Sequence, residues 1–364
     1  MRRQEAERTE RLEQNGTVEH SGRPTITEMT RTKELGMDHA LVTGVAGFIG
    51  SHMAEELLRQ GWVVTGLDKR SPAADPVAAA NLSGLVGHER FHLVVADLNR
   101  TDLTVLAEDA LVVFHLAALA GVRRSWGDNF GDSVSANVLA TQRVLEACVA
   151  AEVPRLVLAS SSSVYGSGSG RPSQESDQLA PVSPYGVTKL AAERLGMAYA
   201  ARPAAATSIV AVRYFTVYGP RQRPDMAVSR IMRAALTGVT VPLYGTGEQL
   251  RDFTFISDVV DATIAAAAAE TKAAVVNVGA GCSVPLSRVF GIVGELAGAK
   301  VPVLHRVAQP GDVDATAADL TRARTLLGYQ PQVQIDAGLR KQWEWLVARD
   351  ALALPTQTVA EARR

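Results

Sequence analysis

One stretch near the start of the chain constrains the fold more than any other. A short apolar run over residues 39–43 leads into a turn in which three glycines are spaced three apart: Gly44, Gly47 and Gly50. The sequence after the turn predicts a helix over 51–60 and a second strand over 62–67 that ends at Asp68. A strand, a glycine turn, a helix, a strand and an acid in this order indicate the βαβ unit that binds dinucleotides.

Each glycine of the turn has a physical task. Gly44 allows the tight turn, Gly47 lets the backbone approach a pyrophosphate, and Gly50 lets the helix pack closely against the strand. The N–H groups and the positive dipole at the start of the helix attract phosphates. Asp68 can accept hydrogen bonds from the adenosine ribose and would repel a 2′-phosphate, which favours NAD over NADP. The two basic residues that follow Asp68 weigh slightly against that preference.

Strands and helices continue to alternate after this unit, which indicates a parallel sheet covered by helices. Apolar runs predict strands over 91–96, 110–116 and 156–159, and a helix is expected over 137–151. We therefore predict an α/β fold, with a Rossmann-type doubly wound parallel sheet and a smaller mixed α/β domain after it. Ligands of such sheets bind at the carboxyl ends of the strands.

Composition excludes several other classes of protein. Of the 364 residues 47% are hydrophobic and 21% charged, which is ordinary for a globular protein. A net charge of −1 lacks the basic footprint of a nucleic-acid binder, and the apolar run at 262–269 is too short to span a membrane. The two cysteines are far apart, so neither a disulfide framework nor a metal site is expected, and a cytoplasmic location is favoured.

A second chemical cluster lies in the middle of the chain. Four serines at 160–163 follow a predicted strand, and Tyr185 and Lys189 share one face at the start of the next helix. An ammonium near a phenol stabilises the phenolate and lowers its pKa, so the tyrosine can act as a general base on a hydroxyl. Alone, a Tyr-x-x-x-Lys pair is usually a surface pair. After a dinucleotide unit and a serine cluster it predicts catalysis.

Together these motifs resemble the extended short-chain dehydrogenase/reductase family of NAD(P)-dependent nucleotide-sugar epimerases, dehydratases and decarboxylases. The resemblance covers about residues 39–347. It implies tightly held NAD and three catalytic residues: Tyr185, Lys189 and Ser161, which stands four residues before Tyr165. The residues it implies for binding NAD are Gly44, Gly47, Phe48, Ile49, Gly50, Asp68, Asp97, Leu98, Leu116, Ala117, Ala118, Tyr185 and Lys189.

The resemblance also suggests a division of the chain. Residues 1–37 mix basic and acidic side chains with few apolar ones, and we predict a disordered N-terminal tail there. We expect an NAD-binding Rossmann domain over 38–212 and a nucleotide-sugar-binding domain over 213–350, partly interwoven with the first. A short C-terminal tail follows over 351–364.

The serine cluster narrows the set of reactions that the resemblance allows. Dehydratases of this family carry an Asp-Glu pair where this chain has Ser162 and Ser163, and a serine is a poor base for the C5 proton. The decarboxylases typically carry a Glu in that stretch and an Arg within the segment here occupied by 225–227, and neither is seen. C4 epimerisation is the chemistry that remains. In it Tyr185, assisted by Ser161, takes the C4 hydroxyl proton while NAD accepts the C4 hydride and returns it to the other face.

The second half of the chain indicates the sugar. The segment 213–226 resembles UDP-glucuronate 4-epimerases, and the hydroxyls of the serine cluster and Thr216 can cradle a carboxylate. Arg223 is either a positioning charge or a solvated loop arginine. The segment 241–254 resembles the family's nucleotide clamp, with Arg251 on the diphosphate. The expected substrate-binding residues are Ser161, Ser162, Ser163, Thr216, Arg223, Met226, Tyr244, Arg251 and Asp312.

Two alternative reactions stay open. The 4-keto form of a uronate is a β-keto acid, so a small change in positioning would turn the epimerase into a decarboxylase that forms UDP-xylose or its 4-keto form. A 4-epimerase of a neutral UDP-hexose is the other. A catalytically inactive NAD-binding protein is disfavoured, because the serine, tyrosine and lysine are all present. The expected partners are a UDP-sugar and a second copy of the chain, and neither nucleic acid nor a membrane.

Overall fold

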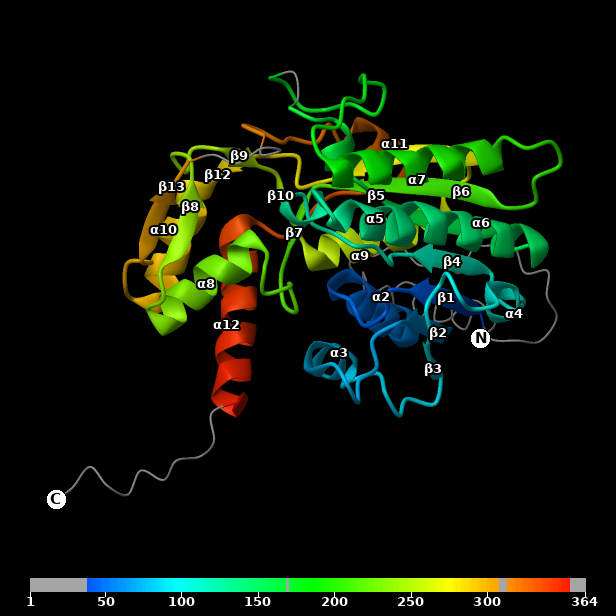
Figure 1. Cartoon of the computed structure of the whole chain (residues 1–364), viewed down its shortest axis with the longest axis horizontal. Coiled ribbons are helices and arrows are strands. Elements are labelled where there is room, and N and C mark those ends of the chain that lie inside the picture. Colours follow the sequence, from blue (N-terminus) through cyan, green and yellow to red (C-terminus); the bar gives the residue numbers. More distant parts are fainter. Residues whose placement is uncertain (1–37, 168–169, 308–312, 354–364) are drawn as a thin grey trace, which may run out of the picture.

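The computed structural model describes residues 38–167, 170–307 and 313–353, and Figure 1 shows how their helices and strands are arranged. The predicted N-terminal tail lies outside these ranges, as do residues 354–364 of the predicted C-terminal tail. None of the helices within the described ranges is both long and apolar enough to cross a lipid bilayer.

Seven parallel strands form the central sheet, in the order β3-β2-β1-β4-β5-β6-β11. The chain enters at β1, adds strands on one side, and then crosses to the other side at β4. This reversal makes the sheet doubly wound and confirms the predicted Rossmann-type fold. The strands are β1 (His39–Thr43), β2 (Val63–Asp68), β3 (Phe91–Val95), β4 (Val112–His115), β5 (Arg155–Ser161), β6 (Ser208–Tyr214) and β11 (Ala273–Val278).

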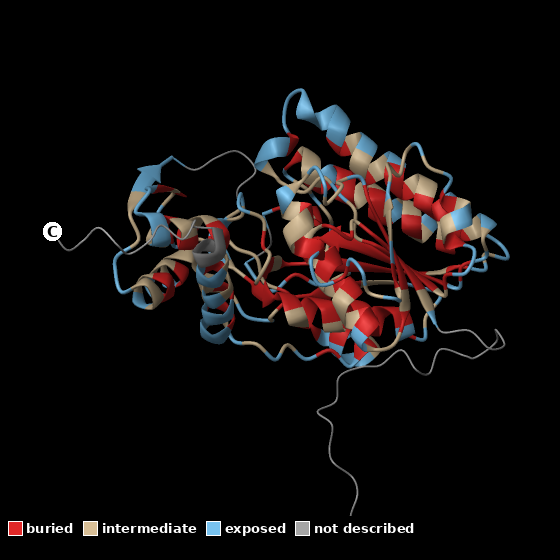
Figure 2. Cartoon of the chain, turned by 90° about the horizontal axis from the view of Figure 1, so that it is seen from below, coloured by how far each residue is buried: buried red, intermediate tan, exposed pale blue. Residues whose placement is uncertain are grey.

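Helices cover both faces of this sheet, and the strands between them are mostly buried (Figure 2). One face carries α4 (Leu103–Ala107), α6 (Ala140–Ala150) and α7 (Pro184–Ala200). The other carries α2 (Phe48–Arg59) and α9 (Ile256–Ala268), with α3 (Pro76–Leu82) beside α2 and α11 (Thr321–Leu327) beside α9 and β11. Burial on both faces explains why the strands read as continuous apolar runs rather than as alternating ones.

The helix expected over 137–151 begins earlier than predicted. The helical segment starts as α5 (Asn129–Val134), continues through a π-helical turn (Ser135–Leu139) and ends as α6. A glycine and several polar residues in its first turns hide this start from an apolar pattern. The π turn widens the helix by one residue, a feature that is frequent at functional sites.

A smaller group of elements lies beside one end of the sheet (Figure 1). Two parallel strand pairs, one antiparallel pair and three helices belong to it. These elements are β7 (Thr216–Tyr218), β10 (Phe253–Phe255), β8 (Val241–Tyr244), β13 (Val303–Arg306), β9 (Leu250–Arg251), β12 (Val284–Pro285), α8 (Ala227–Thr237), α10 (Leu286–Ala297) and α12 (Ile335–Ala353). Between them the chain returns to the central sheet to form α9 and β11.

Candidate active site

The carboxyl ends of five neighbouring strands bring the predicted site residues into one row. Because the strands are parallel and ordered β3-β2-β1-β4-β5, their ends carry in turn Asp97, Asp68, Gly44, Ala117 and Ser161. The reversal of strand order lies at the centre of the row, between β1 and β4, where such sheets bind ligands. A dinucleotide laid along this edge would run from the two acids to the serine.

Two glycines of the turn are fixed by close backbone approaches. Gly44 has φ +74°, and a Cβ at this position would lie 2.7 Å from the backbone nitrogen of Ala117. A Cβ on Gly50 would lie 2.2 Å from the carbonyl oxygen of Gly44. Only glycine fits at either position, so the turn, the start of α2 and the end of β4 form one rigid unit.

This unit fits the pyrophosphate of NAD. The N-cap of α2 is Gly47, and within the described structure no side chain caps the helix there. The first N–H groups of α2 therefore face outward with the positive end of the helix dipole. Of the other predicted NAD residues, Phe48 is buried and Ala118 exposed, and the half-buried ones are Ile49, Asp97, Leu98, Leu116 and Ala117.

Asp68 is buried at the end of β2, where its carboxylate joins the turn to a neighbouring arginine. It accepts a hydrogen bond from the Ala46 backbone N–H at 3.1 Å. The Arg70 guanidinium donates to it through Nε at 3.2 Å and Nη2 at 3.1 Å, and the Arg70 backbone N–H donates at 3.0 Å. The acid thus keeps the position predicted for the ribose contact, with its charge partly balanced by Arg70.

The start of α7 sets Tyr185, the predicted base, against the serine cluster. Ser183 caps the helix by accepting from the Gly186 N–H at 3.1 Å, and Pro184 occupies the first turn. A Cβ on Gly186 would lie 2.6 Å from the carbonyl oxygen of Ser163, so the helix start lies directly on the serine segment. Ser161 lies close enough to Tyr185 to act on the tyrosine's pKa, which it lowers. Ser162 and Ser163 are half-buried in the 3₁₀ turn Ser162–Val164.

The pKa values of these groups are set mainly by burial. Burial raises the pKa of Tyr185, while the Ser161 hydrogen bond and the Arg223 charge act to lower it. In the protein alone the net shift is therefore upward, opposite to the predicted effect of Lys189. Burial lowers the pKa of Lys189 to about 8, and the charge of Glu193 opposes this. A mostly protonated lysine at neutral pH stands one helical turn from the tyrosine.

Two residues that the sequence did not point to hold this centre in place. Ser125, in the loop after β4, accepts a hydrogen bond from the Tyr185 backbone N–H at 3.0 Å. Asn137, in the π turn, accepts from the Leu119 N–H at 2.7 Å and donates to the Thr188 hydroxyl at 3.0 Å. These contacts tie the loop after β4 to the helix that carries the tyrosine. Because they join residues 18 to 60 positions apart, no local pattern could have indicated them.

A buried histidine supports the same strand end. His115 is hydrogen-bonded through Nδ1 to the Thr43 hydroxyl at 2.8 Å and through Nε2 to the Thr141 hydroxyl at 3.0 Å. Burial and the charge of Lys189 lower its pKa to about 3, so the ring is neutral. This histidine joins β1, β4 and α6 behind the predicted cofactor position.

The predicted sugar-binding residues come from the smaller group of elements and the loops that join it to the sheet. The Thr216 N–H donates to the Asp252 carbonyl at 2.9 Å, which places β7 beside the clamp segment. Arg251 lies in β9, and its Nη1 donates to the carbonyl oxygen of Leu250 at 2.8 Å. The Tyr244 ring stacks under the Arg123 guanidinium, 4.0 Å from its centroid. Asp312 lies outside the described residues.

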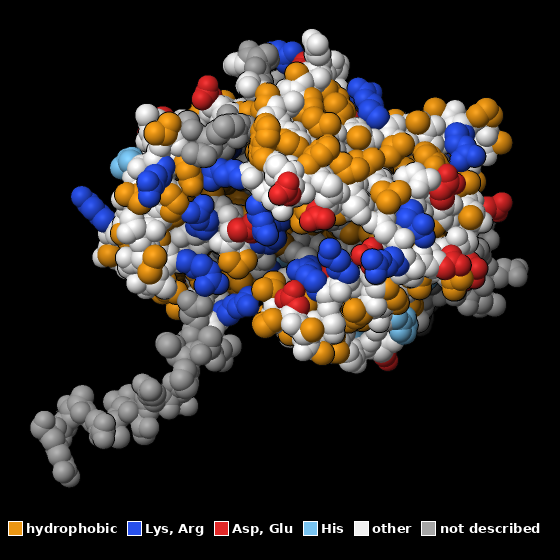
Figure 3. All heavy atoms as spheres, in the orientation of Figure 1, with side chains coloured by type: hydrophobic (Ala, Val, Ile, Leu, Met, Phe, Trp, Pro, Cys, Tyr) orange, Lys and Arg blue, Asp and Glu red, His pale blue; other side chains and the backbone are white. Residues whose placement is uncertain are grey.

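Arginines gather where the smaller group of elements meets the helices and strands of the central sheet. Figure 3 shows basic side chains across the middle of the molecule in the orientation of Figure 1. Arg223 forms a two-pronged ion pair with Asp225, at 3.0 and 3.1 Å, and Arg124 reaches the same carboxylate at 3.9 Å. The Arg223 charge acts to lower the pKa of Tyr185, the predicted base. The Met226 N–H donates to the Arg223 carbonyl at 3.1 Å and begins α8.

Comparison with known proteins gives a consistent result. Residues 40–279 match the model of the NAD dependent epimerase/dehydratase family. The chain is 40% identical over 309 residues to a protein of Bacillus subtilis described as an uncharacterized UDP-glucose epimerase, YtcB, covering 84% of this chain and 97% of that one.

Three similar solved structures contain nucleotide sugars. MoeE5 in complex with UDP-glucuronic acid and NAD is 45% identical with a TM-score of 0.79, over 85% of this chain and 99% of MoeE5. A second MoeE5 structure contains UDP-glucose and NAD. The UDP-glucuronic acid 4-epimerase of Bacillus cereus, in complex with UDP-glucuronic acid and NAD, is 37% identical with a TM-score of 0.81, over 85% of this chain and 99% of that one.

Proposed function

The chain belongs to the NAD-dependent epimerase/dehydratase family, and from that premise we propose that it inverts C4 of UDP-glucuronate to give UDP-galacturonate. It is an NAD-dependent UDP-sugar 4-epimerase, as its relatives are. The choice of an acidic sugar is the part that needs an argument from this chain's own residues.

Two arginines beside Asp225 support that choice: Arg223 and Arg124 share its carboxylate, and the Arg223 charge acts to lower the pKa of Tyr185. The sugar carboxylate at C6 is two carbons from C4, so a cation within reach of the C4 chemistry can also attract the carboxylate. In the protein alone that cation is paired with Asp225, which is 40% exposed and so easily left to solvent. The hydroxyls of Ser162, Ser163 and Thr216 would complete the carboxylate site with neutral donors.

The chain's residues can perform the proton transfers of C4 inversion. Ser161 acts to lower the pKa of Tyr185, so the two hydroxyls would share the proton removed from the C4 hydroxyl. Lys189, charged at neutral pH, favours the phenolate that accepts this proton. When bound, NAD supplies the acceptor and then the donor of the C4 hydride. Rotation of the 4-keto sugar, with UDP held by Arg251 and the clamp segment, would present the opposite face.

A neutral substrate is the second candidate. It is favoured by the resemblance to YtcB and by the UDP-glucose found in a structure of MoeE5. Decarboxylation of the 4-keto uronate remains a possible side reaction, because it requires only a different alignment of the carboxylate.

NMR of the products formed from UDP-glucuronate and NAD is the test of this proposal. We expect UDP-galacturonate in equilibrium with the substrate and no accumulation of NADH. UDP-xylose would indicate a decarboxylase. A turnover with UDP-glucose that exceeds the turnover with UDP-glucuronate by tenfold or more would assign the chain to neutral sugars.

We further propose that the elements around α8, α10 and α12 form the nucleotide-sugar-binding domain. We also propose that two copies of the chain pair through α5, α6 and α7, where Phe130, Leu139 and Val187 are each more than 40% exposed. A cytoplasmic location is supported by the free thiols of Cys148 and Cys282.

A further inference from the structure

An ion pair lies fully buried behind the catalytic residues. Arg213 on β6 is 2% exposed and Glu193 on α7 is 1% exposed. The guanidinium donates to the carboxylate through Nε at 2.9 Å and through Nη2 at 2.6 Å, in a planar fork. Arg213 is among the largest fully buried side chains of the described residues.

Stability alone is a weak explanation for such a pair. Removing two charges from water is costly, and well-packed apolar residues of similar volume are often as stable or more stable. The contacts that the pair makes with its surroundings are therefore the better guide to its role.

Besides pairing with each other, Glu193 and Arg213 each contact the segment that carries the catalytic serine. The Ser160 hydroxyl donates to Glu193 Oε2 at 2.7 Å, and Ser160 immediately precedes the catalytic Ser161 at the end of β5. On the other side, Arg213 Nη1 donates to the Tyr165 hydroxyl at 2.7 Å. That hydroxyl donates in turn to Asn277 Oδ1 on β11 at 2.7 Å. The network thus fixes the serine cluster from its first residue to the turn that follows it.

Glu193 also stands in register with the catalytic groups on α7. Tyr185, Lys189 and Glu193 follow one another at intervals of four residues, so they lie along one face of the helix. The carboxylate is the group that opposes the effect of burial on the lysine, and it acts to keep the pKa of Lys189 high.

Other titratable groups lie on the elements around this helix, and one of them, Glu175, is half-buried with its charge acting on Tyr165. His115 of β4 faces the lysine and is neutral, since its pKa is lowered to about 3 by burial and by the lysine charge. Arg213 of β6 and Tyr165 lie on the far side of the carboxylate. Asp132 of α5 and Glu146 of α6 are exposed at the surface.

We propose that Glu193, held by Arg213, is a positioning residue of the active site: it fixes the strand end that carries Ser161 and supplies the counter-charge for Lys189. This rests on the proposed function, because it assumes that Tyr185 and Lys189 perform the chemistry. Glu193 does not itself touch the reacting atoms.

The pH dependence of kcat tests this proposal. The Glu193→Gln variant keeps the shape of the side chain but loses its charge, so the pKa of Lys189 should fall. The lysine must be charged to act, and the loss of activity at alkaline pH should therefore move to lower pH, by about one unit. The Glu193→Asp variant restores the charge. It should return the alkaline limb of the pH profile, where kcat falls as the pH rises, toward its wild-type position. A purely structural role would lower kcat equally at every pH.

A double variant guards against misfolding. Glu193→Gln leaves the Arg213 charge buried and unpaired, which is costly. Glu193→Gln combined with Arg213→Met removes both charges, and its alkaline limb should lie between those of the wild type and the single variant. If variants that fold and bind NAD keep the alkaline limb of the wild type, the proposal is overturned.

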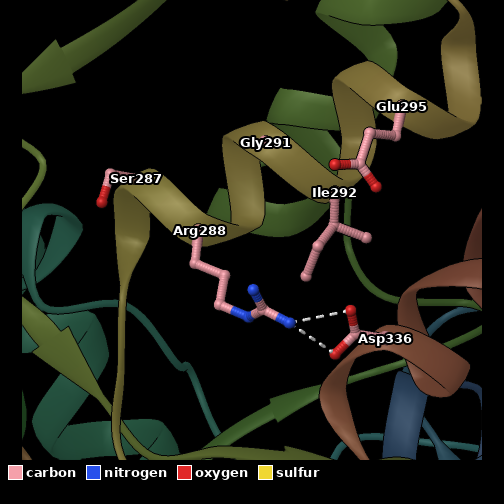
Figure 4. A pocket seen from close by; sticks show the side chains of 6 residues that line it. All are labelled: Ser287, Arg288, Gly291, Ile292, Glu295 and Asp336. Atoms are coloured by element: carbon pink, nitrogen blue, oxygen red, sulfur yellow. Dashed lines mark hydrogen bonds and ion pairs between the residues drawn. The ribbon is translucent and has the colours of Figure 1, made fainter.

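Two controls separate charge from contact. Ser160→Ala removes only the hydrogen bond, and it should lower kcat without moving the alkaline limb. The second control is Arg288→Gln, which removes an ion pair in a surface depression between α10 and α12 (Figure 4). Arg288 donates to both oxygens of Asp336, at 3.0 and 3.1 Å, but the two side chains are more than half exposed. We expect its pH profile to match that of the wild type.

The outcomes distinguish this proposal from the proposed function. If the wild type turns over no UDP-sugar, the function itself fails. If the wild type is active and the limb stays in place in Glu193→Gln, only the role of Glu193 fails.

Discussion

The two halves of the site are built in different ways. The cofactor half consists of strand ends and backbone, and its closest contacts join Gly44, Gly50 and Ala117. The half that we propose to bind the sugar includes long charged side chains, such as Arg223 and Arg124, which are 34% and 73% exposed and share the carboxylate of Asp225. The backbone contacts of the first half need no ligand, whereas a sugar carboxylate bound in the second would replace these ion pairs. Substitutions should therefore affect the two halves differently.

The largest effect is expected where the halves meet, at Tyr185. Tyr185→Phe removes the hydroxyl on whose pKa Ser161 acts and leaves both halves in place, so kcat should fall by about 10²–10⁴. NAD content should stay near that of the wild type. Product NMR measures kcat, and the absorbance of the bound cofactor measures the NAD content. Near-normal turnover in this variant would show that another group is the base.

The cofactor half should tolerate almost no added volume. In Gly50→Ala the new Cβ would meet the Gly44 carbonyl at 2.2 Å, and both groups belong to the backbone, so neither can move cheaply. We expect a cost of about 1–3 kcal/mol, seen as lower NAD affinity or a lower thermal midpoint. Gly291→Ala is the matched control, because Gly291 lies within α10 and a Cβ added there would meet nothing within 4 Å. That change should be neutral or slightly stabilising. Equal effects at the two positions would contradict the comparison.

The same contrast explains how much the sequence could predict. Strand ends and glycine turns follow from local patterns, so the location of Asp68, Gly44 and Ser161 at the carboxyl ends of parallel strands could be foreseen. The contact of Ser125 with Tyr185 could not, because it joins residues 60 positions apart.

Charge was harder to predict than position. The upward pKa shift of Tyr185 arises from burial by the folded chain, which a spacing of four residues does not reveal. Arg213 and Glu193 both stand in stretches whose role in the fold is clear, but only the three-dimensional structure shows that the two meet.

The sugar half should respond in the products rather than in the fold. Arg223→His weakens the cation near the reaction centre, and Thr216→Ala removes a hydroxyl from the proposed carboxylate site. With UDP-glucuronate as substrate we expect the fraction of product that has lost CO₂ to rise several-fold in each variant. The thermal midpoint should hardly change, because Arg223 is partly exposed and Thr216 holds β7 through its backbone N–H. Unchanged product ratios would argue against a carboxylate site here.

The smallest effect is expected at Arg70, a partly exposed charge that touches the cofactor half. Its side chain is 33% exposed and pairs with Asp68, which also accepts from the Ala46 N–H. Arg70→Ala leaves that backbone contact in place, and ion pairs of this exposure contribute about 0.2–1 kcal/mol. NAD affinity should therefore change by less than about fivefold.

Discrimination against NADP should rise in the same variant, because the Asp68 charge is no longer balanced and repels a 2′-phosphate more strongly. Titration of the apoprotein with each cofactor measures both affinities, and Lys69→Ala serves as the control because Lys69 is exposed. A hundredfold loss of NAD affinity in Arg70→Ala would mean that this arginine holds the cofactor directly. In that case the cofactor half too would depend on a side chain that must rearrange, and the difference between the two halves would be one of degree.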